Sequence, residues 1–158
     1  MGREIEKKYL LRGLPAGIGE GVRIAQGYLS VGDPEVRVRK KGGDFFLTRK
    51  GGAGFVREED EHAISEAAFE ILWSLTERAR IEKTRYEIVG ADGLTWEIDE
   101  FQTSAGAQLF LAEVELPDES QAFAVPPAIA EVLARDVTAD AAYKNKNLAV
   151  NGLPTEKI

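Results

Sequence analysis

Short segments in which apolar and polar residues alternate run through most of the chain. Such period-two alternation predicts β-strands, because successive side chains of a strand point to opposite faces of a sheet. Glycine turns such as Gly42-Gly43 and Asp92-Gly93 separate many of these segments, as in antiparallel hairpins. The pattern predicts eight strands, over residues 3–11, 22–30, 35–41, 44–50, 54–62, 80–89, 94–101 and 108–116.

Three other segments have the features of helices. Ser65 is a suitable N-cap for a helix over 66–78, where apolar residues recur at helical spacing. Pro127 suits the first turn of a second helix, whose apolar face would include Leu133. A short third helix is expected at 147–150. Many short strands with few helices predict an α+β fold whose sheet is large enough to curl or to close.

Length and composition fit one soluble domain. The 158 residues are 44% hydrophobic and 30% charged, which is typical of a globular chain with its own core. The chain contains no cysteine, which excludes disulfides and thiolate chemistry and favours a reducing compartment. The N-terminus is charged and has no apolar run suited to a signal peptide or a membrane span. We therefore expect a single domain over residues 1–158, cytoplasmic and without a membrane partner.

Charged residues dominate the polar face of the predicted strands. The formal net charge of -7 disfavours a nucleic-acid partner, which needs a basic face. Residues i and i+2 of a strand share a face, and charged residues recur at this spacing on strand after strand. The acidic members are Glu4, Glu6, Glu59, Glu61, Glu97, Asp99, Glu113 and Glu115. The basic members are Lys8, Arg37, Arg39, Lys50, Arg57, Lys83 and Arg85, with Lys144 and Lys146 in a later basic segment.

Two interpretations of this charged face stay open at this point. An ordinary sheet would expose the face to solvent and pair opposite charges across strands. A barrel could instead enclose the face, which is costly unless the charges are paired or bind a charged ligand. Acidic doublets offer oxygen ligands to Mg²⁺ or Mn²⁺, and arginine doublets match phosphate oxygens. Carboxylates beside such bases are the combination that phosphoryl transfer uses.

Other catalytic groups are scarce in the sequence. The single histidine, His62, stands at the end of a predicted strand and is interpreted as structural or solvent-exposed. The glycine-rich segment 51–54 lacks the Gly-Lys-Ser/Thr ending of a P-loop and is interpreted as a hairpin loop. Neither a Ser-His-Asp nor a Cys-His arrangement is available for nucleophilic catalysis.

Short charged motifs follow one another along the chain in a characteristic order. They begin with Glu4-Ile5-Glu6-Lys7-Lys8 and continue with Gln26-Gly27-Tyr28-Leu29, Arg37-Val38-Arg39, Leu47-Thr48-Arg49-Lys50, Arg57-Glu58-Glu59-Asp60-Glu61, Glu82-Lys83-Thr84-Arg85, Trp96-Glu97-Ile98-Asp99, Glu113-Val114-Glu115 and Tyr143-Lys144-Asn145-Lys146. This set resembles the CYTH superfamily, the triphosphate tunnel metalloenzymes, over essentially the whole chain. It is most similar to the short, single-domain bacterial inorganic triphosphatases.

The resemblance implies a closed eight-stranded antiparallel β-barrel with a charged interior and a few helices outside. It implies metal-dependent hydrolysis of inorganic triphosphate to diphosphate and phosphate inside that barrel. The implied ligands of Mg²⁺ or Mn²⁺ are Glu4, Glu6, Asp99, Glu113 and Glu115. The implied triphosphate ligands are Arg37, Arg39, Lys50, Arg57, Lys83, Arg85, Lys144 and Lys146. The implied catalytic residues are Lys8, Tyr28, Glu4 and Glu6, supported by Glu59, Glu61 and Glu97.

Three alternatives to an inorganic triphosphatase are considered. A class IV-type adenylyl cyclase would need a nucleoside pocket, and no such pocket is identifiable in the sequence. A thiamine or nucleoside triphosphatase would need an aromatic platform, for which Tyr28 or Trp96 are candidates. A non-catalytic polyphosphate-binding module would need the basic doublets alone. Because this chain keeps its acidic doublets as well, an enzyme is favoured.

Overall fold

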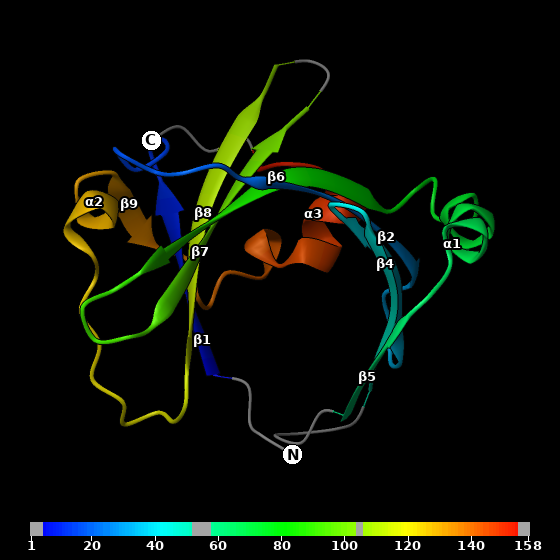
Figure 1. The fold of residues 1–158 in the computed structure, drawn as a ribbon, viewed down its shortest axis with the longest axis horizontal. Coiled ribbons are helices and arrows are strands. Elements are labelled where there is room, and N and C mark those ends of the chain that lie inside the picture. Colours follow the sequence, from blue (N-terminus) through cyan, green and yellow to red (C-terminus); the bar gives the residue numbers. More distant parts are fainter. Residues whose placement is uncertain (1–4, 52–57, 104–105, 155–158) are drawn as a thin grey trace. The chain divides into compact units, whose positions relative to one another are not determined.

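The chain forms a predominantly antiparallel sheet with few helices, described over residues 5–51, 58–103 and 106–154 in a computed structural model (Figure 1). The strands are β1 (Ile5–Leu11), β2 (Val22–Ser30), β3 (Glu35–Lys41), β4 (Asp44–Gly51), β5 (Glu58–Ala63), β6 (Arg80–Val89), β7 (Thr95–Gln102), β8 (Gln108–Leu116) and β9 (Leu133–Asp136). The helices are α1 (Glu66–Trp73), α2 (Pro127–Ala130) and α3 (Asn145–Asn151), with a 3-10 turn η1 (Ala141–Tyr143).

The sheet has one strand more than the alternation predicts. The described strands pair in the order β5-β4-β3-β2-β6-β7-β8-β1-β9, which leaves β5 and β9 as the two ends. The expected closed eight-stranded barrel is therefore not confirmed, because the described strands form an open sheet of nine. A physical reason is that β9 pairs with part of the second edge of β1, with Tyr9 opposite Asp136.

Two of the expected helices are shorter than predicted. The helix that begins at Pro127 ends at Ala130, and Leu133 lies in β9 opposite Leu11 of β1. This backbone pairing outweighs the helical spacing of the apolar residues. The first helix ends at Trp73 rather than at residue 78. The hydroxyl of Thr76 donates to the carbonyl of Trp73 at 2.7 Å, so side chain–backbone bonding takes over from the helix there.

The contacts within the chain divide it into two compact units, which are described separately. Among the described residues, the first unit comprises 23–51, 58–82 and 144–152. The second comprises 5–22, 83–103, 106–143 and 153–154. A single functional domain over the whole chain stays a prediction. Within these described ranges, no helix has the length and apolar character that crossing a membrane requires.

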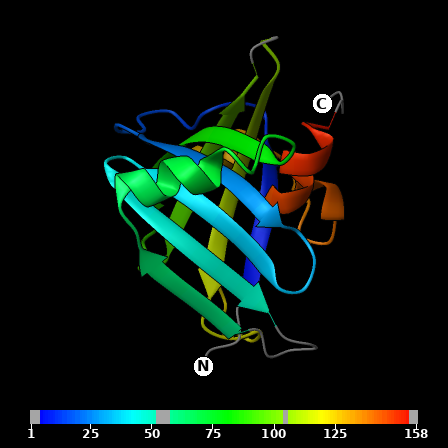
Figure 2. The same cartoon turned by 90° about the vertical axis from the view of Figure 1, so that its right-hand side faces the viewer.

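In the first unit α1 covers one face of the strands β3 and β4 (Figure 2). Phe69 is the buried residue of α1, and its ring centre lies 5.1 Å from that of Phe45 in β4 and 5.4 Å from that of Trp73. Val38 of β3 is fully buried on the same face, since it pairs with Leu47, two residues after Phe45. The apolar side of this unit thus lies under α1, and the alternate residues of its strands point the other way.

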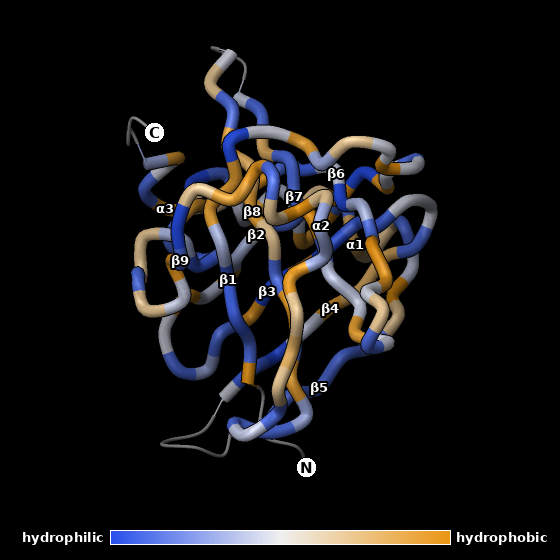
Figure 3. The backbone as a smooth tube through the Cα atoms, turned by 90° about the vertical axis from the view of Figure 1, so that its left-hand side faces the viewer, coloured by the Kyte–Doolittle hydropathy of each residue, from blue (hydrophilic) through white to orange (hydrophobic). Residues whose placement is uncertain are grey.

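In the second unit the apolar core lies on one face of β1, β7 and β8, beside α2. Hydrophobic and hydrophilic residues follow one another within these strands rather than in separate strands (Figure 3). The buried core consists of Leu11, Trp96, Ile98, Ala112, Val114, Leu116 and Ile129. The alternate residues of the same strands, among them Glu97 and Glu113, therefore occupy the opposite, charged face.

Candidate functional site

The charged face of the first unit is built by β2, β3, β4 and β5. Residues directly opposite each other on neighbouring strands share a face. One row of directly opposite residues runs across the strands through Tyr28, Arg37, Thr48 and Glu61. In the row on one side of it, Gln26 stands opposite Arg39. In the row on the other side, Lys50 stands between Glu35 and Glu59. Every predicted site residue that is described on these strands thus lies on this one face. His62 pairs with Leu47 on the other face and is exposed, as expected.

The basic residues of this face differ in how they are held. Arg39 donates from Nη2 to Glu61 at 3.2 Å, and the hydroxyl of Thr48 donates to the same carboxylate oxygen at 2.9 Å. Nζ of Lys50 lies 3.9 Å from Oε1 of Glu59. These contacts fit the supporting role predicted for both glutamates. The Nε of Arg37 is buried and has no hydrogen-bond acceptor among the residues described, a costly state that a phosphate oxygen would relieve.

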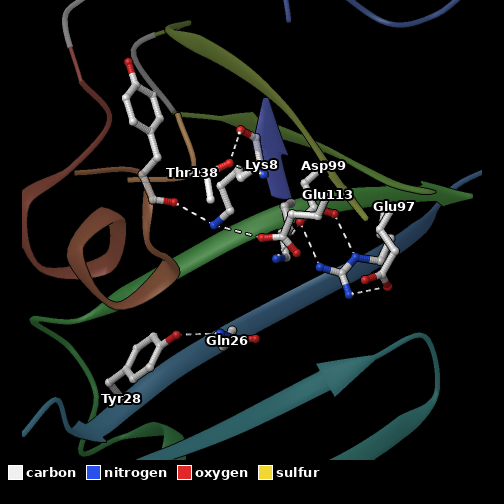
Figure 4. Close-up of polar contacts among 10 residues, drawn as sticks. Lys8, Gln26, Tyr28, Glu97, Asp99, Glu113 and Thr138 are labelled. Atoms are coloured by element: carbon white, nitrogen blue, oxygen red, sulfur yellow. Dashed lines mark hydrogen bonds and ion pairs between the residues drawn. The ribbon is translucent and has the colours of Figure 1, made fainter. Parts of the chain in front are cut away.

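Tyr28 is buried beside the amide of Gln26, a residue of the same motif for which the sequence alone predicts no role. Its side chain is 4% exposed, and Gln26, at 1% exposed, donates from Nε2 to its hydroxyl oxygen at 2.7 Å (Figure 4). Burial raises the pKa of Tyr28 above its ordinary value, Glu35 adds to that rise, and Arg37 and Gln26 oppose it. The phenol is therefore neutral near pH 7 and keeps a hydrogen that it can donate.

In the second unit Lys8 is held between a carboxylate and a backbone carbonyl. Its side chain is 6% exposed, and Nζ lies 2.8 Å from Oε1 of Glu113 (Figure 4). The same ammonium donates to the carbonyl of Tyr143 in η1 at 2.9 Å. The hydroxyl of Thr138 accepts from the backbone N–H of Lys8 at 3.0 Å. Both ends of this residue are thus fixed by the segment that follows β9.

A buried ion-pair network joins β6 and β7. Asp99 accepts from Lys83 Nζ at 2.8 Å and from Arg85 Nε and Nη2 at 2.8 and 2.9 Å, and Arg85 also donates to Glu97 at 2.8 Å. Burial raises the pKa of Asp99, but Lys83 and Arg85 outweigh it and hold that pKa well below its usual range. Burial in turn lowers the pKa of Lys83. A predicted metal ligand and two predicted phosphate ligands are therefore paired with one another here.

A second carboxylate pair lies beside Lys8. Glu6 of β1 stands directly opposite Glu115 of β8, and the next pair on that face is Lys8 with Glu113. Like charges directly opposite on adjacent strands repel, and a divalent cation that both carboxylates bind would offset this. These oxygen donors fit Mg²⁺ or Mn²⁺. Within the described ranges no three acidic or histidine side chains gather into a complete metal site.

Some of the remaining predicted site residues lie within the described ranges of the chain and others do not. Glu4 and Arg57 lie outside the described residues. Lys144 is the exposed N-cap of α3 and Lys146 lies in its first turn, so their assignment to triphosphate binding stays a prediction. Trp96 is 0% exposed in the core on the apolar face, which excludes it as a platform for a base or thiazolium ring.

Sequence reasoning missed several polar groups that this geometry brings to the site. Gln26 and Glu35 have the spacing of the charged face, two residues before Tyr28 and Arg37, and that spacing is the signal that could have identified them. Thr138 and the carbonyl of Tyr143 carry no such signal. They reach Lys8 through contacts that span some 130 residues of sequence.

The chain is similar to known proteins over almost its full length. No family model matches it. The inorganic triphosphatase of Nitrosomonas europaea is 41% identical over 152 residues, which cover 94% of this chain and 97% of that protein. The inorganic triphosphatase of Acetivibrio thermocellus is 41% identical over 155 residues, which cover 96% of each. The crystal structure of the inorganic triphosphatase NE1496 matches with a TM-score of 0.72 at 38% identity, covering 98% of this chain and 99% of that one. With this identity over nearly the whole length of both relatives, the chain belongs to the inorganic triphosphatases, within the CYTH superfamily that its ordered motifs resemble.

Proposed function

We propose that the chain hydrolyses inorganic triphosphate to diphosphate and phosphate with the help of Mg²⁺ or Mn²⁺. The observation that carries this is that the predicted site residues described on strands all lie on the charged face of their unit, away from the apolar core. Near-full-length identity to two inorganic triphosphatases supports the choice of substrate. Retention of the acidic residues favours catalysis over binding alone.

The residues of the first unit suit the binding of phosphate. Arg37 offers a buried Nε that lacks an acceptor within the described part of the chain. Arg39 is oriented by Glu61, and Lys50 adds a positive charge on the same face. Tyr28, as a neutral phenol, donates a hydrogen bond. Forked and point-charge donors together neutralise a triphosphate and hold it in place for attack by water.

The residues of the second unit suit a metal ion and the charge that develops in the reaction. Glu6 and Glu115, which stand opposite each other, would hold the divalent ion, with Glu113 and Glu4 as further predicted ligands. When bound, such an ion neutralises charge on the phosphate oxygens. Lys8 supplies a buried ammonium whose position is fixed by Glu113 and by a carbonyl. A fixed cation of this kind stabilises developing negative charge without reorganisation.

Product analysis tests the proposed function directly. We expect the protein with Mg²⁺ or Mn²⁺ to release orthophosphate from tripolyphosphate faster than from ATP or thiamine triphosphate. Orthophosphate and cyclic AMP are to be assayed side by side with all three substrates and both ions. Substantial cyclic AMP from ATP would contradict the proposal, and so would binding of tripolyphosphate without turnover.

We expect Arg37→Lys to raise the KM for tripolyphosphate about tenfold, with a smaller effect on kcat. Lysine keeps the positive charge but loses the forked donors, including the buried Nε, and one lost charge-assisted hydrogen bond corresponds to about tenfold in binding. Steady-state phosphate release measures both constants. The matched control is Arg49→Lys, because Arg49 lies on the opposite face of β4 and binds Asp60 at 2.6 Å. An equal change of KM in both variants would exclude a specific role for Arg37.

A further inference from the structure

We propose that Gln26 is a positioning residue that directs the hydroxyl hydrogen of Tyr28 toward the phosphate of the substrate. The inference rests on the proposed function and adds a residue that does not itself touch the substrate. Gln26 precedes Tyr28 by two positions in β2, so both side chains lie on the charged face. Their hydrogen bond, 2.7 Å from Nε2 to the hydroxyl oxygen, is buried (Figure 4).

The surroundings of Gln26 explain which end of its amide faces the tyrosine. Arg39 stands directly opposite Gln26 in the register of β2 and β3. A guanidinium has donors only, so the amide oxygen is the end suited to Arg39 and the amide NH₂ is the end suited to Tyr28. At 1% exposed, the amide has almost no access to water that could replace these partners. Gln26 therefore acts as a donor to Tyr28.

The neighbours of Tyr28 donate to its hydroxyl oxygen. The hydroxyl hydrogen can therefore be donated to a ligand. Gln26 donates a hydrogen bond to the hydroxyl oxygen, and Arg37 stands directly opposite Tyr28, so both neighbours offer hydrogen-bond donors to the oxygen and no acceptor to its hydrogen. Burial and Glu35 keep the phenol protonated. Tyr28 also lines a cavity of about 250 Å³, to which Glu77 and Arg78 contribute charged side chains. Phosphate oxygens only accept hydrogen bonds, so the phenol hydrogen matches them.

The backbone of Tyr28 is fixed as well, which leaves the hydroxyl as the adjustable part. Gly27 packs against Thr76 so closely that an added Cβ would overlap the threonine side chain. The N–H of Tyr28 donates to the carbonyl of Ala79 at 2.9 Å. Because β2 is held in this way against the segment between α1 and β6, the amide of Gln26 sets the direction of the hydroxyl. Loss of the amide would leave the ring in place and its hydroxyl free to rotate.

A double-mutant cycle of Gln26→Met and Tyr28→Phe tests the proposal. Methionine fills nearly the same volume as glutamine without its amide. We expect Gln26→Met to lower kcat for tripolyphosphate about five- to tenfold, the loss of one hydrogen bond, while KM changes less than about twofold. In the Tyr28→Phe protein the same substitution should have no further effect, because the hydroxyl that it positions is gone. Gln102→Met, at an exposed strand position, is the matched control.

The outcomes separate the inference from the proposed function. An equal fall of kcat in the wild-type and Tyr28→Phe backgrounds would overturn the positioning role and leave a structural one. An unchanged kcat in Gln26→Met would overturn it too. Should the methionine variant fail to fold by circular dichroism, Gln26→Asn, whose amide is one methylene too short to reach Tyr28, takes its place in the same cycle. Absence of tripolyphosphate hydrolysis by the wild type would instead overturn the proposed function.

Discussion

Replacement of Glu115 by Gln is expected to lower the turnover of tripolyphosphate by about 100-fold or more, with the fold intact. Glu115 faces Glu6 across β1 and β8, and a neutral amide there removes one of the carboxylates that would hold the divalent ion. Neutralisation of phosphate charge by a metal ion is worth several kcal/mol, which corresponds to this factor or more. The fold should persist, because glutamine has nearly the volume of glutamate and can still form hydrogen bonds at this position.

Phosphate release at increasing Mg²⁺ concentration measures this effect, and urea unfolding checks the fold. The matched control is Glu131→Gln, since Glu131 is an exposed glutamate of the same unit at the end of α2. We expect the control to behave as the wild type does. Full activity of Glu115→Gln at the Mg²⁺ concentration that saturates the wild type would remove Glu115 from the metal ligands.

Asp99→Asn is expected to lower the free energy of unfolding by about 3–5 kcal/mol, as does the loss of one partner of a buried ion pair. The substitution leaves the ammonium of Lys83 buried without its carboxylate and weakens two hydrogen bonds from Arg85. A second substitution, Lys83→Met, removes the stranded charge. The double variant should therefore regain part of the stability, and a double variant less stable than Asp99→Asn would contradict the pairing.

The contribution of the Asp99 carboxylate to stability should also depend on pH in a defined direction. The folded-state pKa of Asp99 lies below the unfolded value of about 3.9, so its contribution is complete above that pH. The contribution is lost as pH falls toward the folded-state pKa. Below about pH 4 the free energy of unfolding, measured with urea, should thus fall more steeply with decreasing pH in the wild type than in Asp99→Asn. Parallel pH profiles for the two proteins would contradict the assignment, and Asp44→Asn at an exposed position of β4 is the control.

The strands were predictable because charged residues at i and i+2 label one face directly. The segments 22–30, 35–41, 80–89 and 108–116 form strands with the bounds that alternation predicts. The same reasoning predicted which side chains share a face. Registers depend on turn lengths and on pairing across the sheet, so the sequence could indicate the face of Lys83 but not its partner Asp99.

What could not be predicted depends on contacts between distant parts of the chain. Val132 and Leu133 fit an apolar helix face as well as a strand, and pairing with β1, more than 120 residues earlier, decides between them. Lys8 has the spacing of a site residue, but the carbonyl that holds it comes from Tyr143. A backbone carbonyl has no sequence signature, which is why this part of the site was missed.

The division of the chain into two units has a spectroscopic consequence. The chain has two tryptophans, and each unit contains one of them. Trp73, the last residue of α1, stacks on Phe69 of the same helix, and Trp96 is enclosed in the core of the second unit. Trp73→Phe and Trp96→Phe therefore yield two proteins whose fluorescence reports on one unit each. If the emission of both proteins changes at the same denaturant concentration, the two units unfold as one cooperative unit. If the two changes are separate, the units unfold independently. The two tryptophans thus measure whether unfolding of the units is coupled.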